Sequence, residues 1–74
     1  MTLFFILGSV YKQIDDRTFE VTVYHNSRDW TIKCDLSDEL FNKNIRPLVA
    51  DWVVLRFDSE IKDIKKRYCI IKVI

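Results

Sequence analysis

The sequence predicts an all-β protein, a five-stranded antiparallel barrel with one short helix between its third and fourth strands. Most of the chain alternates apolar and polar residues with a period of two, which is typical of half-buried strands. The alternation is interrupted once by a helix-capping pattern, and the 74 residues include one glycine and one proline. A chain of this length forms one domain, which we place at residues 1–74.

The first two strands are expected over residues 3–13 and 18–25. In the first, the isolated Gly8 predicts a bulge or a sharp bend where the sheet coils into a barrel. In the second, alternate apolar residues face the core, namely Phe19, Val21 and Val23.

The third strand is expected over residues 29–36, after a polar hairpin loop at 25–28. Trp30 has the parity of the apolar residues in this strand, so we expect it in the core. Cys34 and Cys69 both fall within apolar alternation, where a thiol is usually a small buried hydrophobe rather than a disulfide partner or a metal ligand.

After the third strand, Ser37 is suited to cap a short helix at 37–43. Alternation resumes at 51–57, the fourth strand, and returns at 66–73, the fifth. The polar stretch that joins these two strands is expected to be a loop or a single helical turn. The expected inward residues of the fourth strand are Val53, Leu55 and Phe57.

Five strands with a helix between the third and the fourth have the layout of an OB-fold, and an SH3-like barrel is the nearest alternative. The position of the helix favours the OB-fold. In that fold the third strand lies beside the fifth, so Cys34 and Cys69 should be neighbours, both reduced.

Three segments carry a family resemblance through the middle of the chain: Leu36-Ser37, Ile45-Arg46-Pro47-Leu48 and Asp51-Trp52-Val53. Their spacing resembles that of bacterial translation initiation factor one, a small S1-like OB-fold protein. The resemblance implies a non-enzymatic RNA-binding factor on the small ribosomal subunit, with ribosomal RNA and other translation initiation factors as partners. It also implies that Arg46 clamps a phosphate, although an internal ion pair with Asp51 or Glu39 is equally open on sequence grounds.

The candidate RNA-binding residues combine an aromatic side chain with a basic cluster. Trp52 is expected to point outward beside inward Val53, where it can stack on a base, cover the barrel end or meet a protein partner. Tyr11, Tyr24 and Tyr68 are also expected outward, where cross-strand packing is the commoner role. The other candidates are Lys43, Arg46, Lys65, Lys66, Arg67 and Tyr68, of which the run 65–67 is otherwise a solvated loop.

Charge and composition restrict the function further. The net charge is +1, but residues 45–74 carry +3 and residues 1–44 carry −2, so a basic surface would use the second half. One histidine, no glycine-rich loop and no metal-ligand spacing argue against an enzyme, a cofactor or a metal site. The apolar run near the N-terminus is too short to span a membrane, so we expect a protein of the cytoplasm or an organelle matrix.

Two other functions remain open. One is a protein-interaction barrel that docks through the acidic helix, Phe41 and Trp52. The other is a small single-stranded DNA-binding protein, because base stacking and phosphate contacts serve DNA and RNA equally.

Overall fold

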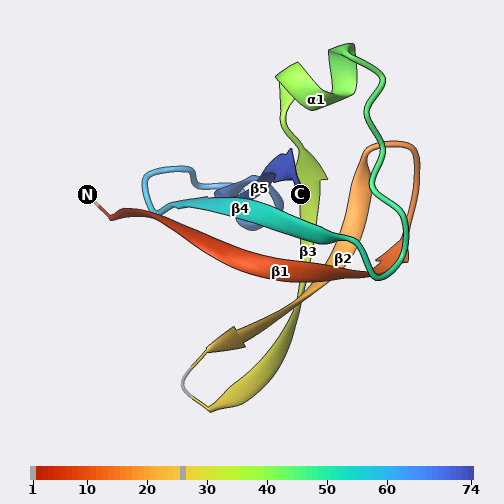
Figure 1. Cartoon of the computed structure of the whole chain (residues 1–74). Helices are drawn as coiled ribbons and strands as arrows, with labels where there is room; N and C mark the ends of the chain where they lie inside the picture. The colour runs from red at the N-terminus through yellow and green to blue at the C-terminus, as the bar shows by residue number, and fades with distance from the viewer. Residues whose placement is uncertain (1, 26) are drawn as a thin grey trace.

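A computed structural model describes residues 2–25 and 27–74, without the side chains of His25, Ile64 and Lys65. Five strands form a closed barrel, with one short helix between the third and fourth strands, as predicted (Figure 1). This is the arrangement of an OB-fold. The elements in chain order are β1 (Leu3–Gln13), β2 (Thr18–His25), β3 (Arg28–Leu36), α1 (Asp38–Asn42), β4 (Trp52–Asp58), α2 (Ile64–Arg67) and β5 (Tyr68–Val73).

The barrel closes in the order β1-β2-β3-β5-β4. Strand β1 belongs to both sides of the barrel, because Leu3–Ser9 pair with β4 and Gly8–Gln13 pair with β2. The predicted contact between the third and fifth strands is confirmed, but these two strands run parallel. The expectation of a wholly antiparallel barrel was therefore wrong, and the reason is topological. Up and down directions cannot alternate without a break around a closed ring of five.

The β3–β5 pairing is short. It consists of two residue pairs, Asp35 with Cys69 and Leu36 with Ile70. We call this contact the β3–β5 seam. It brings the two cysteine-bearing strands together, and Cys34 and Cys69 are both free thiols.

The core confirms the period-two alternation predicted for the second, third and fourth strands. Inward residues of all five strands meet inside the barrel, and Leu40 of α1 covers one end. The Ser37 hydroxyl caps this helix as expected by accepting the Leu40 N–H at 3.2 Å. The buried apolar residues are Val10, Phe19, Val21, Val23, Cys34, Leu36, Leu40, Val53, Leu55 and Ile70.

Of the bulge or bend predicted at Gly8, the bulge is wrong, while Gly8 does lie where β1 passes from pairing with β4 to pairing with β2. The register shift of β1 lies between Val10 and Lys12, not at the glycine. A Cβ atom at Gly8 would lie 2.5 Å from Val21 Cγ1 and 3.2 Å from the Thr22 carbonyl oxygen. Glycine is therefore required here because β1 and the core side chains of β2 approach too closely for any side chain.

Trp30 was wrongly expected in the core, since 48% of it is exposed. Its parity is as predicted, because it lies opposite inward Val23. The pairing of β1 with β2, however, begins at Gly8 opposite Val23, and the β2–β3 hairpin continues past that point. The tip of the hairpin therefore projects beyond the barrel, as Figure 1 shows.

The remaining differences concern the segment between β4 and β5. It contains α2, a single helical turn of four residues, where the sequence allowed either a loop or such a turn. Phe57, expected inward, is half-buried, with its ring centroid 4.8 Å from that of Phe4 and 4.9 Å from that of Tyr68. In the described part of the chain, no helix has the length and apolar character needed to cross a membrane.

Candidate nucleic-acid interface

The outer surface of four neighbouring strands carries a row of three small side chains that ends at a tryptophan. Trp52 of β4 pairs with Ser9 of β1, Ser9 pairs with Thr22 of β2, and Thr22 pairs with Thr31 of β3. Directly paired residues in antiparallel strands point to the same side of a sheet. These residues therefore form one continuous strip across the outside of the barrel.

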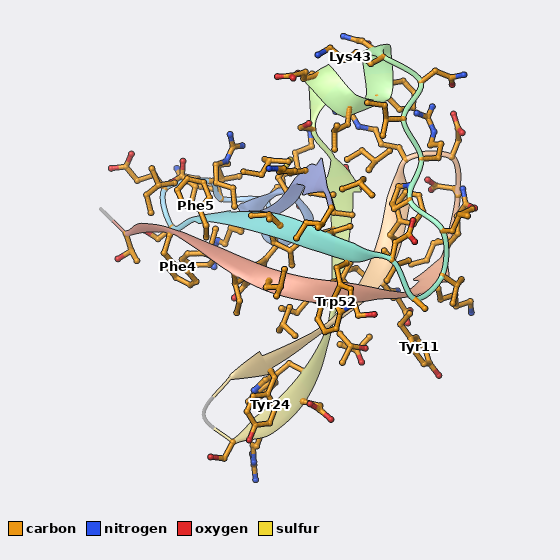
Figure 2. The ribbon with its side chains drawn as sticks, in the orientation of Figure 1. Phe4, Phe5, Tyr11, Tyr24, Lys43 and Trp52 are labelled. Atoms are coloured by element: carbon orange, nitrogen blue, oxygen red, sulfur yellow. The ribbon has the colours of Figure 1, made fainter. Side chains whose placement is uncertain are left out.

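Three exposed aromatic residues surround this strip. Trp52 ends it and is 55% exposed, which confirms the outward orientation predicted beside buried Val53. Tyr11 lies two residues beyond Ser9 and is 63% exposed, and Tyr24 lies two residues beyond Thr22 and is 68% exposed. Figure 2 shows all three on the side of the barrel away from α1. We call this surface the aromatic face.

Two lysines border the aromatic face. Lys12 of β1 and Lys33 of β3 lie on either side of Glu20 of β2, in the row next to the strip. Both lysines are exposed, and neither forms an ion pair with any residue that the structure describes. Their ammonium groups are therefore available to a polyanion that crosses the face.

Arg46 is already engaged within the chain. Its Nε and Nη2 each donate to a different carboxylate oxygen of Asp16 at 3.0 Å, and its guanidinium lies 4.5 Å from the Phe41 ring centroid. These hydrogen bonds lower the pKa of Asp16 and raise the pKa of Arg46. The sequence offered Asp51 or Glu39 as partners. Both were wrong, because Asp51 accepts the Leu48 N–H and Glu39 pairs with Lys43.

The structure does not bring the other predicted residues together with Trp52. Lys43, the C-cap residue of α1, is exposed across the barrel from Trp52 in Figure 2 and pairs with Glu39 at 3.2 Å. Arg67 is half-buried and donates through Nε to the Ile61 carbonyl at 2.7 Å. Tyr68 was expected outward but is half-buried and packs against Phe57. Lys66 is exposed on α2, and the side chain of Lys65 lies outside the described residues.

Sequence reasoning missed Lys12 and Lys33 as binding residues and treated Tyr11 and Tyr24 as ordinary sheet tyrosines. The signal was present in the alternation, because Tyr24 and Lys33 have the outward parity of their strands. What the sequence lacked was the register that places them on the same outer surface as Trp52. In place of one basic cluster, the structure shows an aromatic face with cations at its border.

Comparison with known proteins finds no matching family model and no matching curated protein. The chemistry of the site is therefore argued from its geometry. Exposed aromatic rings around small side chains provide flat surfaces on which bases can stack. Among the described residues, His, Cys, Asp and Glu form no cluster of three suited to a metal ion.

Proposed function

We propose that this chain is a non-enzymatic protein that binds single-stranded RNA on its aromatic face. The observation that carries the proposal is the placement of Trp52, Tyr11 and Tyr24 around the small side chains of Ser9 and Thr22 on the outside of an OB-fold barrel. OB-folds bind oligonucleotides on the face that includes their second and third strands. Stacking on an exposed aromatic ring contributes about 1–3 kcal/mol per base.

The dimensions of the face suit a strand of a few nucleotides. Trp52 and Thr22 are two strands apart, which corresponds to about 10 Å, and Tyr24 lies a further two residues along β2, about 7 Å. Lys12 and Lys33 are placed to contact phosphates at the border while bases lie on the rings. Small-subunit ribosomal RNA, in the cytoplasm or an organelle matrix, is the target that the resemblance to initiation factor one supports.

The structure favours this function over docking of a protein through the acidic helix. Phe41 is half-buried, and two guanidinium groups lie over its ring, those of Arg17 and Arg46. Trp52 lies across the barrel from α1 (Figure 2). The helix, Phe41 and Trp52 therefore do not form one contiguous patch.

The test is the affinity for single-stranded RNA oligonucleotides, measured by fluorescence anisotropy at several salt concentrations. Trp52→Ala and Tyr24→Ala should each weaken binding by about 1–3 kcal/mol while the melting temperature changes little, since both side chains are mostly exposed. Lys12→Ala with Lys33→Ala should flatten the plot of log affinity against log salt by about 0.7 for each phosphate that these lysines no longer neutralise.

Lys43→Ala is the matched control, because Lys43 is an exposed lysine away from the aromatic face. It should leave affinity and salt slope unchanged. If Lys43→Ala weakens binding and the Lys12 and Lys33 substitutions do not, RNA binds on the side of α1 and the aromatic face is not the interface. Cosedimentation with small ribosomal subunits in low salt, reversed in high salt, tests the ribosomal target.

A further inference from the structure

A second surface lies away from the aromatic face. An open groove of about 600 Å³ runs over the outer side of β3, β5 and β4, between α1 and α2. Register pairs Arg56 with Cys69 and Cys69 with Asp35, so these three side chains form a row across the groove floor. Lys66 of α2 lies at its border.

The acidic side chains that line the groove already have partners. Asp38 pairs with Arg17, Glu39 pairs with Lys43 at 3.2 Å, and Asp35 accepts a hydrogen bond from the Thr18 hydroxyl at 2.7 Å. Two of the three carboxylates are thus neutralised by a cation from this chain.

The basic side chains are paired unequally. Arg17 already has partners, because it forms an ion pair with Asp38 and donates through Nε to the Leu36 carbonyl at 3.1 Å. Arg56 forms no hydrogen bond and no ion pair with any described residue, and its Nε is shielded from solvent without an acceptor. Lys66 has no carboxylate partner within the described chain. The groove therefore presents two cations that have no ion-pair partner in the described chain, Arg56 and Lys66, and one carboxylate that no cation neutralises, Asp35.

The Arg56 Nε is too shielded for a ligand to touch, so the donors open to an acceptor from outside are the two Nη groups, which no described residue engages. The guanidinium fork matches phosphate and carboxylate oxygens in a bidentate arrangement. A phosphate monoester has three acceptor oxygens and a charge of about −1.5 to −2 near neutral pH, so it can pair with Arg56 and Lys66 at once against the single opposing charge of Asp35.

We propose that this groove binds the 5′-phosphate of a nucleotide, with Arg56 as the bidentate donor and Lys66 as the second cation. The groove volume is within the range of about 300–1,000 Å³ typical of small-molecule sites, so it has room for more than the phosphate. Ile61 and Ile71 provide apolar lining for the nucleoside. The nucleotide is either free or the 5′ end of an RNA strand. No residue is shared with the aromatic face, so this site is independent of the proposed function.

The experiment is an NMR titration of the full chain that follows the Arg56 Nε–H signal, with affinities from calorimetry. The probes are adenosine monophosphate, adenosine, and one oligonucleotide with either a 5′-phosphate or a 5′-hydroxyl. The monophosphate should shift the Arg56 signal, and adenosine should not. Arg56→Lys keeps the charge but removes the fork, so it should weaken phosphate binding at least about tenfold. Arg28→Ala, at an exposed arginine of the hairpin, is the matched control and should have no effect.

Two further variants separate the possible outcomes. Asp35→Asn removes a negative charge from the groove floor and should strengthen binding of the monophosphate. Trp52→Ala should leave that binding unchanged, even if it abolishes RNA binding on the aromatic face. Preference for the 5′-phosphorylated strand over the 5′-hydroxyl strand, abolished in Arg56→Lys, identifies a strand end as the ligand, and binding of the monophosphate alone identifies a free nucleotide. The proposal is overturned if neither phosphorylated probe shifts the Arg56 signal at millimolar concentration, or if Arg28→Ala and Arg56→Lys weaken binding equally.

Discussion

Among single residues, Phe41 shows how the helix is joined to the barrel. The guanidinium carbons of Arg46 and Arg17 lie 4.5 Å and 4.9 Å from its ring centroid, and each guanidinium also pairs with a carboxylate. A cation over an aromatic ring stabilises by about 0.5–1 kcal/mol at an exposed site and by more where the pair is desolvated. Phe41 therefore links α1 to the turn between β1 and β2, which supplies both Arg17 and the partner of Arg46.

Gly8 allows a prediction about stability. Gly8→Ala places a methyl group 2.5 Å from Val21 Cγ1, and the nearby Thr22 carbonyl belongs to the backbone of a paired strand. Overpacking of this kind costs about 1–3 kcal/mol, which should appear as a lower midpoint of urea unfolding. Ser9→Ala, on the outward side of the same strand, should change the midpoint little. An unchanged midpoint in Gly8→Ala would mean that β1 and β2 can separate at no cost.

Single residues also show where sequence reasoning succeeds and where it stops. Parity correctly placed Trp52 outside and Val53 inside, because alternation follows directly from strand geometry. It failed for Trp30, since parity gives the side of a strand but not whether the barrel extends that far. The partner of Arg46 was missed because Asp16 lies thirty positions away, in a turn whose position depends on barrel closure.

Among the elements, the turn between β1 and β2 is held by two aspartates. Asp15 accepts the N–H groups of Arg17 at 2.8 Å and Thr18 at 2.7 Å, and these bonds lower its pKa. Asp16 accepts two hydrogen bonds from the Arg46 guanidinium, and these bonds lower the pKa of Asp16 as well. Both carboxylates are thus stabilised in their charged form by the folded state.

The acid dependence of stability follows from these two shifts. Each folded pKa is below the ordinary value of 3.8, so the stabilisation is present above that pH and is lost as the pH falls through the folded pKa. Asp15→Asn with Asp16→Asn should therefore make urea stability depend less steeply on pH below about 4. Asp29→Asn, on the projecting hairpin, is the control and should keep the parent's slope. If the double variant loses stability below about pH 4 as steeply as the parent, the charged forms of Asp15 and Asp16 do not stabilise the fold.

Element boundaries were predictable to within two residues, and two of the shifts have local causes. The first two strands have the predicted bounds of 3–13 and 18–25. The fourth strand begins one residue late, at Trp52, because the Asp51 carboxylate accepts the Leu48 N–H and closes a turn. The fifth begins at Tyr68 because α2 extends to Arg67. Neither the side-chain bond nor the single helical turn leaves a periodic signal in the sequence.

At the scale of the whole molecule, one of the two thiols lies inside the barrel and the other lies on its outer surface. Cys34 is fully buried, and burial raises its pKa to about 12. Cys69 is half-buried on the groove floor, and burial raises its pKa as well. Since the thiolate is the reactive form, both should react slowly in the folded protein.

Thiol labelling therefore reports on unfolding. In Cys69→Ser, where Cys34 is the remaining thiol, an aromatic disulfide reagent at pH 8 should label the protein only as fast as the barrel opens. The labelling rate should rise with urea in parallel with the unfolded fraction. Rapid labelling of Cys34 without urea would show that the core is accessible in the native state. Cys34→Ala, which retains Cys69, should be labelled faster than Cys69→Ser.

The β3–β5 seam has a consequence for the internal motions of the barrel. The seam has two residue pairs, whereas each of the other four strand pairings has at least five, so the barrel should open there first. The Ser37 amide donates to the Ile70 carbonyl across it at 2.8 Å. In hydrogen exchange, this amide should exchange its proton by partial opening, well before amides of β2, which pairs on both sides. The groove proposed to bind a nucleotide spans the seam from Arg56 to Asp35, so a phosphate bound there should slow that exchange selectively.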